Sequence, residues 1–266
     1  MRDITLGMYF PGDTIVHRMD PRTKFILVIV FIACALSAKS YISYALVLVT
    51  LLLSIAVSRI SPMALVRGLK PLVVMIIFTG LINMFYTPGT PIWSFGFLTL
   101  TLEGIRNSIF GVLRILMLVS STFLLTYTTA PIALTDGLES LLNGLRRIKV
   151  PVHELAMMMS IALRFIPILI EETDKIMSAQ KARGADFDTG KLTQRAKALL
   201  PILVPLFLST FRRADELAIA MESRCYHGGE GRTRMKTLKY RPSDFVAMAS
   251  GFAVLAGVIV LGRLGL

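Results

Sequence analysis

The sequence is poor in cysteine, histidine and charged residues. Its 266 residues include two cysteines and three histidines, and 17% are charged, whereas about a quarter are charged in soluble globular chains. Cys34 lies in an apolar run and Cys225 in a basic stretch, so no disulfide between them is expected. The histidines are widely separated, at positions 17, 153 and 227. No metal site and no cofactor is therefore predicted.

The chain is rich in apolar segments instead. Hydrophobic residues make up 54% of it, and the mean hydropathy is +0.67. A helix needs about 20 apolar residues to cross a bilayer. Apolar runs approach or reach that length at residues 25–38, 41–57, 72–86, 105–127 and 245–261, although the first is short for a full span. The sequence predicts an all-α, polytopic membrane protein with about five transmembrane or partly inserted helices.

Positive charge is unevenly distributed along the chain, whose net charge is +12. Lysine and arginine precede Phe25 and recur between residues 59 and 70, a stretch expected to be a short loop, but residues 87–104 contain none. Basic residues gather on the cytoplasmic side of membrane proteins. This pattern predicts a multi-pass protein of the cell membrane with a cytoplasmic N-terminus. Residues 87–104 should form an external loop with Trp93 as an interfacial anchor.

Three parts are expected: N-terminal membrane helices at 1–130, a cytoplasmic region of long amphipathic helices at 131–242, and a C-terminal transmembrane helix at 243–266. The middle part should begin with a short helix over Thr135–Leu145 that carries an Asp136/Glu139 capping box. Two long helical patterns follow, at His153–Arg183 and Lys191–Tyr226.

The apolar middles of these two patterns, 155–170 and 198–211, are only about 14–16 residues long, a length typical of buried or interfacial helices. If both crossed the membrane, residues 171–197 would lie outside with six lysine and arginine residues, against the positive-inside rule. Helices along the cytoplasmic face are therefore favoured over two further spans.

Both long patterns end in an arginine between two small residues. The first ends in Ala182-Arg183-Gly184 and the second in Ser223-Arg224-Cys225, followed by His227-Gly228. Glycine commonly ends a helix, so both arginines are expected at exposed helix tips. One such arginine can be explained by the negative end of the helix dipole. Two in the same setting favour docking into two similar grooves, where arginine can bind a carboxylate through both nitrogens.

With these two motifs, the sequence resembles the T component of energy-coupling factor (ECF) transporters, the EcfT family. The resemblance covers most of the chain and is densest in PVHELAMMMSIALRFIPIL (151–169), QKARGADF (180–187) and RRADELAIAMESRCYHGGEGRTR (212–234). In that family, two Ala-Arg-Gly-type motifs at the ends of cytoplasmic coupling helices dock into grooves of two ABC-type ATPases. Arg183 matches the first motif, and Arg224 matches the second, which departs from the family form as Ser-Arg-Cys.

The resemblance implies that the chain is not itself an enzyme and works with two EcfA-like ATPase subunits, as a heterodimer or homodimer. It also implies a small membrane-embedded S component that binds a vitamin or similar micronutrient, and a coupling region at 131–242. The ATPase-docking residues would be the two tripeptides at 182–184 and 223–225. The apolar middles would contact the S component, with these candidate residues: Met157, Met158, Ile161, Phe165, Leu203 and Phe207.

Other functions fit less well. GADFDTGK (184–191) resembles a phosphate loop, but Leu192 stands where serine or threonine is needed. His153 beside Glu154 is expected to cap or pack at a helix start rather than act as an acid or base. A permease with its own substrate path would carry intramembrane charge, for which Arg114 and Arg106 are the candidates.

Two further alternatives concern partners. The basic tail (Arg232, Arg234, Lys236, Lys239 and Arg241) could suit nucleic acid, but beside a membrane span it more often faces anionic lipid. No nucleic-acid partner is therefore predicted. A T component dedicated to one metal or vitamin system, as opposed to one shared among several S components, stays open.

Overall fold

The computed structural model describes residues 9–95, 98–185, 187, 192–228 and 237–264. Most of the GADFDTGK segment (184–191), and Arg232, Arg234 and Lys236 of the basic tail, therefore lie outside the described residues. The chain forms two compact units. One combines residues 7–140 with 238–266 and is called the helical bundle below. The other comprises residues 141–237 and is called the crossing unit.

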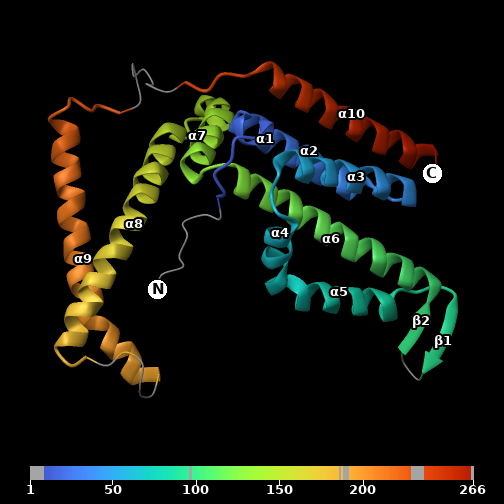
Figure 1. Ribbon diagram of the computed structural model, residues 1–266, viewed down its shortest axis with the longest axis horizontal. Coiled ribbons are helices and arrows are strands. Elements are labelled where there is room, and N and C mark those ends of the chain that lie inside the picture. The colour runs from blue at the N-terminus through green and yellow to red at the C-terminus, as the bar shows by residue number, and fades with distance from the viewer. Residues whose placement is uncertain (1–8, 96–97, 186, 188–191, 229–236, 265–266) are drawn as a thin grey trace. The chain divides into compact units, whose positions relative to one another are not determined.

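The helical bundle is built on α2 (Pro21–Ser37), which packs against α3 (Tyr41–Ser58), α6 (Leu102–Thr128) and α10 (Pro242–Leu264) (Figure 1). A short helix, α1 (Ile15–Arg18), precedes α2. The tight connection expected between the first two apolar runs is present, because only residues 38–40 separate α2 from α3. The core of the bundle joins residues from four helices: Val30, Cys34, Ala35, Ala38, Tyr44, Val47, Leu51, Phe110, Met117 and Val258.

The sequence prediction was wrong for residues 62–69, which form a helix and not a loop. Helix α4 (Pro62–Leu69) begins with proline at its first position, where the missing N–H has no helical partner to lose. A short 3₁₀ helix, η1 (Lys70–Leu72), then joins it to α5 (Val73–Tyr86). Basic residues do not distinguish a loop from a helix here, because Arg67 lies in the last turn of α4, where positive charge is favourable.

The segment expected as an external loop contains a two-stranded antiparallel hairpin. Strand β1 (Pro91–Phe95) pairs with β2 (Leu98–Thr101), with Ser94 opposite Thr99 and a bulge between Pro91 and Trp93. Isoleucine, tryptophan, phenylalanine and threonine favour strands, which explains the pairing. Helix α6 follows at once, three residues earlier than predicted, with the Thr101 hydroxyl accepting the Gly104 N–H at 3.0 Å.

A buried polar cluster ties together the starts of α2 and α10 and the end of α6. The Asp244 carboxylate accepts the backbone N–H of Asp20 at 3.1 Å and that of Arg241 at 2.6 Å. Lys24 donates to the Thr128 carbonyl and the Thr129 hydroxyl, both at 2.9 Å. Asp20, Lys24 and Asp244 are all buried. We call these three residues the basal cluster.

Arg114 closes the opposite end of α2. Its Nη2 donates to the Ala38 carbonyl at 3.3 Å, and its guanidinium carbon lies 5.7 Å from the centre of the Tyr44 ring. Ala38 is the C-cap of α2, so the positive charge faces the negative end of that helix. Arg114 of α6 is therefore bonded to the end of a neighbouring helix.

Five helical segments within the described residues are long and apolar enough to cross a membrane: Tyr41–Ser58, Pro62–Tyr86, Leu102–Thr128, Val152–Ala182 and Pro242–Leu264. The all-α, polytopic membrane class is thereby confirmed. The membership differs from the predicted set, because α2 has only 17 residues and α8 (Val152–Ala182) meets the criteria. By length and composition alone, α8 is thus a candidate span, whereas the sequence favours the cytoplasmic face for it.

Helix α7 (Pro131–Leu142) begins four residues before the expected start at Thr135. Asp136 and Glu139 therefore lie inside the helix, and the predicted capping box is wrong. The crossing unit then contains the 3₁₀ helix η2 (Asn143–Ile148), α8 and α9 (Leu192–Glu222). The two long helices agree with the patterns at 153–183 and 191–226 to within a few residues, with Pro167 inside α8 and Pro201 and Pro205 inside α9.

Candidate functional site

The first arginine tip is a Schellman motif at the end of α8. The N–H of Gly184 donates to the Lys181 carbonyl, and the N–H of Ala185 donates to the Gln180 carbonyl, each at 3.0 Å. These are the paired bonds that define the motif. Gly184 has a φ of 86°, the left-handed conformation that the motif requires. Arg183 is the C-cap residue, immediately before the left-handed position.

The second tip repeats the motif in the same register. The N–H of Cys225 donates to the Glu222 carbonyl at 2.8 Å, and the N–H of Tyr226 donates to the Met221 carbonyl at 3.0 Å. Arg224 therefore occupies the position that Arg183 occupies in α8. The two small-Arg-small tripeptides, expected from sequence to be similar, have the same backbone hydrogen bonds.

The residue that ends the second helix differs from the expectation. Cys225 takes the left-handed conformation, with a φ of 56°, and Gly228 comes three residues later. A side chain in this region costs about 1–2 kcal/mol, because its Cβ approaches the following carbonyl. All six tripeptide residues, from Ala182 to Gly184 and from Ser223 to Cys225, are exposed. Neither guanidinium has a carboxylate partner among the described residues.

Replacing Cys225 with glycine is expected to stabilise the second tip. Glycine adopts the left-handed conformation without the Cβ contact, so local opening of the last turn of α9 should become about 1 kcal/mol less favourable. Hydrogen exchange of the peptide around residues 219–226 should slow by roughly fivefold. The matched control is Gly184→Ala, which places a Cβ at the left-handed position of the first tip and should speed hydrogen exchange there. Unchanged exchange in both variants would contradict backbone strain at Cys225.

Helices α8 and α9 cross in antiparallel directions at a charged contact (Figure 1). The Glu172 carboxylate of α8 accepts hydrogen bonds from the Ser209 hydroxyl and from Arg213 Nη2 of α9, the latter at 2.8 Å. Gln180 of α8 lies opposite Pro201 of α9, so residue numbers fall along one helix as they rise along the other. The two helices thus run antiparallel, and their tips lie in opposite directions from the crossing.

The prolines of α9 explain the second contact. Pro205 has no N–H, so the Pro201 carbonyl four residues earlier lacks its helical donor. The side-chain amide of Gln180 supplies a donor instead, with its Nε2 3.4 Å from that carbonyl oxygen. A proline that would weaken an isolated helix is here part of the contact between two helices.

The tips lie at equal distances along the chain from the ion pair between Glu172 and Arg213. Arg183 follows Glu172 by eleven residues, and Arg224 follows Arg213 by eleven. At a rise of about 1.5 Å per residue, each helical arm is about 16 Å long. Neither arm contains proline. The crossing unit therefore has two proline-free helical arms of equal length between this ion pair and an exposed arginine.

The candidate S-component residues occupy two different surfaces. Ile161 and Phe165 line a cavity of about 280 Å³ that α9 closes from the other side through residues such as Leu217 and Met221. Met158, Leu203 and Phe207 are exposed, and Met157 is half-buried. The exposed apolar face of α9 extends beyond Leu203 and Phe207, the two α9 residues predicted from sequence. Side chains on this face are 48–65% exposed: Leu199, Leu200, Leu203, Val204, Phe207, Leu208 and Phe211.

Sequence reasoning missed the crossing contacts of Glu172, Gln180, Ser209 and Arg213. One signal was present: Glu172 and Arg213 are 41 positions apart, the same interval that separates Arg183 from Arg224. Another was the carbonyl left without a donor by Pro205. Neither signal identifies the partner residue, because that depends on how the two helices are oriented.

Comparison with known proteins gives consistent results. A family model described as cobalt transport protein, CbiQ, matches residues 12–235. The energy-coupling factor transporter transmembrane protein EcfT of Thermosediminibacter oceani is 52% identical over 260 residues, which cover 97% of this chain and 98% of the relative. EcfT of Ruminiclostridium cellulolyticum is 50% identical over 261 residues, 98% of each chain. EcfT of Bacillus subtilis is 46% identical over 264 residues, 99% of each.

The resemblance noted in the sequence is therefore confirmed along nearly the whole chain. It includes both tips and the crossing, since the matched relatives extend through them. The all-helical membrane architecture agrees with their description as transmembrane proteins. The chain belongs to the EcfT family, the transmembrane components of energy-coupling factor transporters.

Proposed function

We propose that this chain is the coupling subunit of an ECF-type ABC transporter. It would link ATP hydrolysis by two partner ATPases to uptake of a vitamin or similar micronutrient through an S component. The observation that carries the proposal is the pair of Schellman tips in the same register, each with an exposed arginine. Dipole capping could explain one tip, but it does not require two arms of equal length.

The tips are suited to two similar partner grooves. Small residues on both sides of Arg183 and Arg224 let each tip enter a narrow groove, and the free guanidinium can bind a carboxylate there. Since the helices run antiparallel, the two sites face partners on opposite sides of the crossing. A pair of related ATPases, either a homodimer or a heterodimer, would meet this requirement.

The crossing would transmit force between the partners. Movement of one ATPase acts on one arm, and the contact of Glu172 with Ser209 and Arg213 passes it to the other helix. The exposed apolar face of α9 then offers the S component a contact surface. Ile161 and Phe165 line the cavity that α9 closes, so they face α9 and not a partner. Leu203 and Phe207 are exposed and are therefore the stronger candidates for contact with the S component.

This arrangement requires α8 and α9 to lie on the cytoplasmic side. Six lysine and arginine residues between positions 171 and 197 favour that side, and a cytoplasmic N-terminus follows from the same rule. The alternative, a permease with its own path, would need intramembrane charge for substrate. Arg114 is engaged with the Ala38 carbonyl, which weakens that alternative.

Purification in mild detergent with mass spectrometry of the co-eluting chains tests the proposal. The wild-type chain is expected to bring down two ATPase chains and at least one small membrane protein. A Leu203→Glu/Phe207→Glu variant should lose the small membrane protein and keep the ATPases, because only the apolar face has changed. If the chain is recovered alone and transports substrate without any partner, the permease alternative would be supported instead.

The same experiment separates a shared from a dedicated component. Several different small membrane proteins would indicate a shared T component, and a single fixed partner a dedicated one. Loss of the ATPases together with the small protein in the α9 variant would contradict separate contact surfaces.

A further inference from the structure

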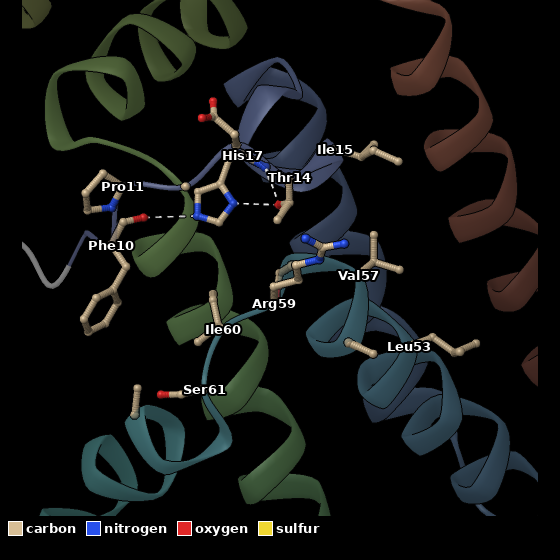
Figure 2. Close-up of a pocket in the computed structure, with 15 residues that line it drawn as sticks. Phe10, Pro11, Thr14, Ile15, His17, Leu53, Val57, Arg59, Ile60 and Ser61 are labelled. Atoms are coloured by element: carbon tan, nitrogen blue, oxygen red, sulfur yellow. Dashed lines mark hydrogen bonds between the residues drawn. The ribbon is translucent and has the colours of Figure 1, made fainter.

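A cavity of about 970 Å³ lies in the helical bundle, between the N-terminal segment and the junction of α3 with α4. Figure 2 shows its two walls: Phe10, Thr14 and His17 on one side, and Leu53 and Val57 on the other. Ligand sites of comparable volume are mostly apolar and carry a few placed polar groups. No residue proposed above for the tips, the crossing or the α9 face lines it.

Arg59 supplies the unpaired charge of this cavity. It follows the last residue of α3 in a left-handed conformation, with a φ of 54°. Its guanidinium lies in the space between Thr14 and Val57 (Figure 2). The Arg59 guanidinium has no ion pair or hydrogen bond with any residue in the part of the chain that the structure describes.

The other ionisable groups of the lining are already engaged. The Asp13 carboxylate is 3.5 Å from Arg18 Nη2. The His17 ring lies 2.7 Å from the Thr14 hydroxyl through Nδ1 and 3.1 Å from the Phe10 carbonyl through Nε2. Arg59 is therefore the ionisable side chain of this lining that has no partner among the described residues, and it is exposed to solvent. Because a guanidinium offers several donors in one plane, a phosphate group matches it well.

The apolar wall continues out of the cavity along an exposed side of α3. Val57, Leu53 and Val49 follow one another at intervals of four residues, and all three are exposed, at 49%, 61% and 51%. Residues at this spacing lie on one face of a helix. With 18 residues, α3 is about 27 Å long, close to the thickness of the hydrocarbon core. A spanning α3 would therefore place Arg59, which follows its last residue, at a membrane surface.

We propose that this cavity binds an anionic glycerophospholipid. The phosphate is held by Arg59, and one acyl chain follows Val57, Leu53 and Val49. A protein helix would cover the apolar wall but would leave the Arg59 charge unmatched unless it carried an acidic residue at that depth. A phospholipid supplies a phosphate for Arg59 and an acyl chain for the apolar wall, and phospholipid surrounds a membrane protein.

Native mass spectrometry of the full chain in detergent, with added dioleoyl phosphatidylglycerol, tests the proposal. The wild type should retain one phosphatidylglycerol with an apparent affinity at least tenfold above that for dioleoyl phosphatidylcholine. Arg59→Gly keeps the left-handed turn available and removes the guanidinium, so it should reduce retention about tenfold without disturbing the fold. The control is Arg67→Ala, an exposed arginine of α4 outside the cavity, which should retain the lipid like the wild type.

Two additional experiments distinguish a lipid from a free phosphate compound or a protein as the ligand. Glycerol 3-phosphate at millimolar concentration should not displace the lipid, because it has no acyl chain. A photo-reactive residue at position 57 in cell membranes should cross-link mainly to lipid. Equal retention by Arg59→Gly and the wild type, displacement by glycerol 3-phosphate, or cross-linking mainly to protein would each overturn the proposal.

Discussion

Replacing both tip arginines with glutamate is expected to release the ATPases from the purified complex and abolish coupled uptake. Truncating one partner of a buried, hydrogen-bonded charge pair typically costs about 2–5 kcal/mol. Charge reversal adds repulsion at both sites, so binding should fall by at least about a hundredfold. The small membrane protein should remain bound, because the α9 face is unchanged.

The fold of the tips should survive this change. Arg183 and Arg224 are exposed, and the Schellman bonds are made by backbone atoms. Glutamate at a helix C-terminus is unfavourable with the dipole by about 0.3–1 kcal/mol, which is small beside the docking effect. A useful control is Arg212→Glu, which makes the same charge change at an exposed position of α9 away from the tip. Normal vitamin uptake by the Arg183→Glu/Arg224→Glu variant would refute the docking model.

The second large effect concerns stability and the basal cluster. Asp244→Ala should destabilise the helical bundle by about 3–5 kcal/mol, because it leaves the buried N–H group of Asp20 and the partly buried N–H group of Arg241 without their acceptor. Asp244→Asn keeps one acceptor oxygen and should have an intermediate effect. For a chain of this size the midpoint of thermal unfolding should fall by roughly 6–20 °C in the alanine variant.

Cys34 provides the measurement. It is 1% exposed in the core of the bundle, whereas Cys225 is exposed at the tip. In a Cys225→Gly background, Cys34 is the remaining thiol of the two in the sequence, so a thiol-reactive dye reports unfolding of the bundle during heating. Asp215→Ala, at an exposed position of α9, should melt like its parent. An Asp244→Ala midpoint within about 2 °C of the parent would show that the cluster contributes little.

The two largest effects therefore test the two units separately. The arginine variants should change binding and leave thermal stability near that of the wild type. The Asp244 variant should change stability and leave the tip geometry intact, because the tips are held by hydrogen bonds within their own helices. An unstable arginine variant would indicate that the tips also have a structural role.

Sequence alone was sufficient for several features whose determining interactions are local. The length and apolarity of residues 41–57 and 245–261 predicted α3 and α10, because helix hydrogen bonds and membrane insertion depend on a continuous segment. The two arginine tips were also predicted, since helix ends are set by a few neighbouring residues. Even there, Cys225 was missed as the left-handed residue, because a glycine three positions later is the stronger signal by composition.

Tertiary structure decided the features that join distant residues. The contact of Glu172 with Ser209 and Arg213 spans about forty positions, and that of Asp20 with Asp244 spans 224. Such pairs form only when helices are placed side by side, and no local propensity encodes which face meets which. The same holds for the Arg59 cavity, whose walls come from the separate segments 10–17 and 53–64. The sequence determined which segments become helices and where two of them end, and packing decided how those ends are held.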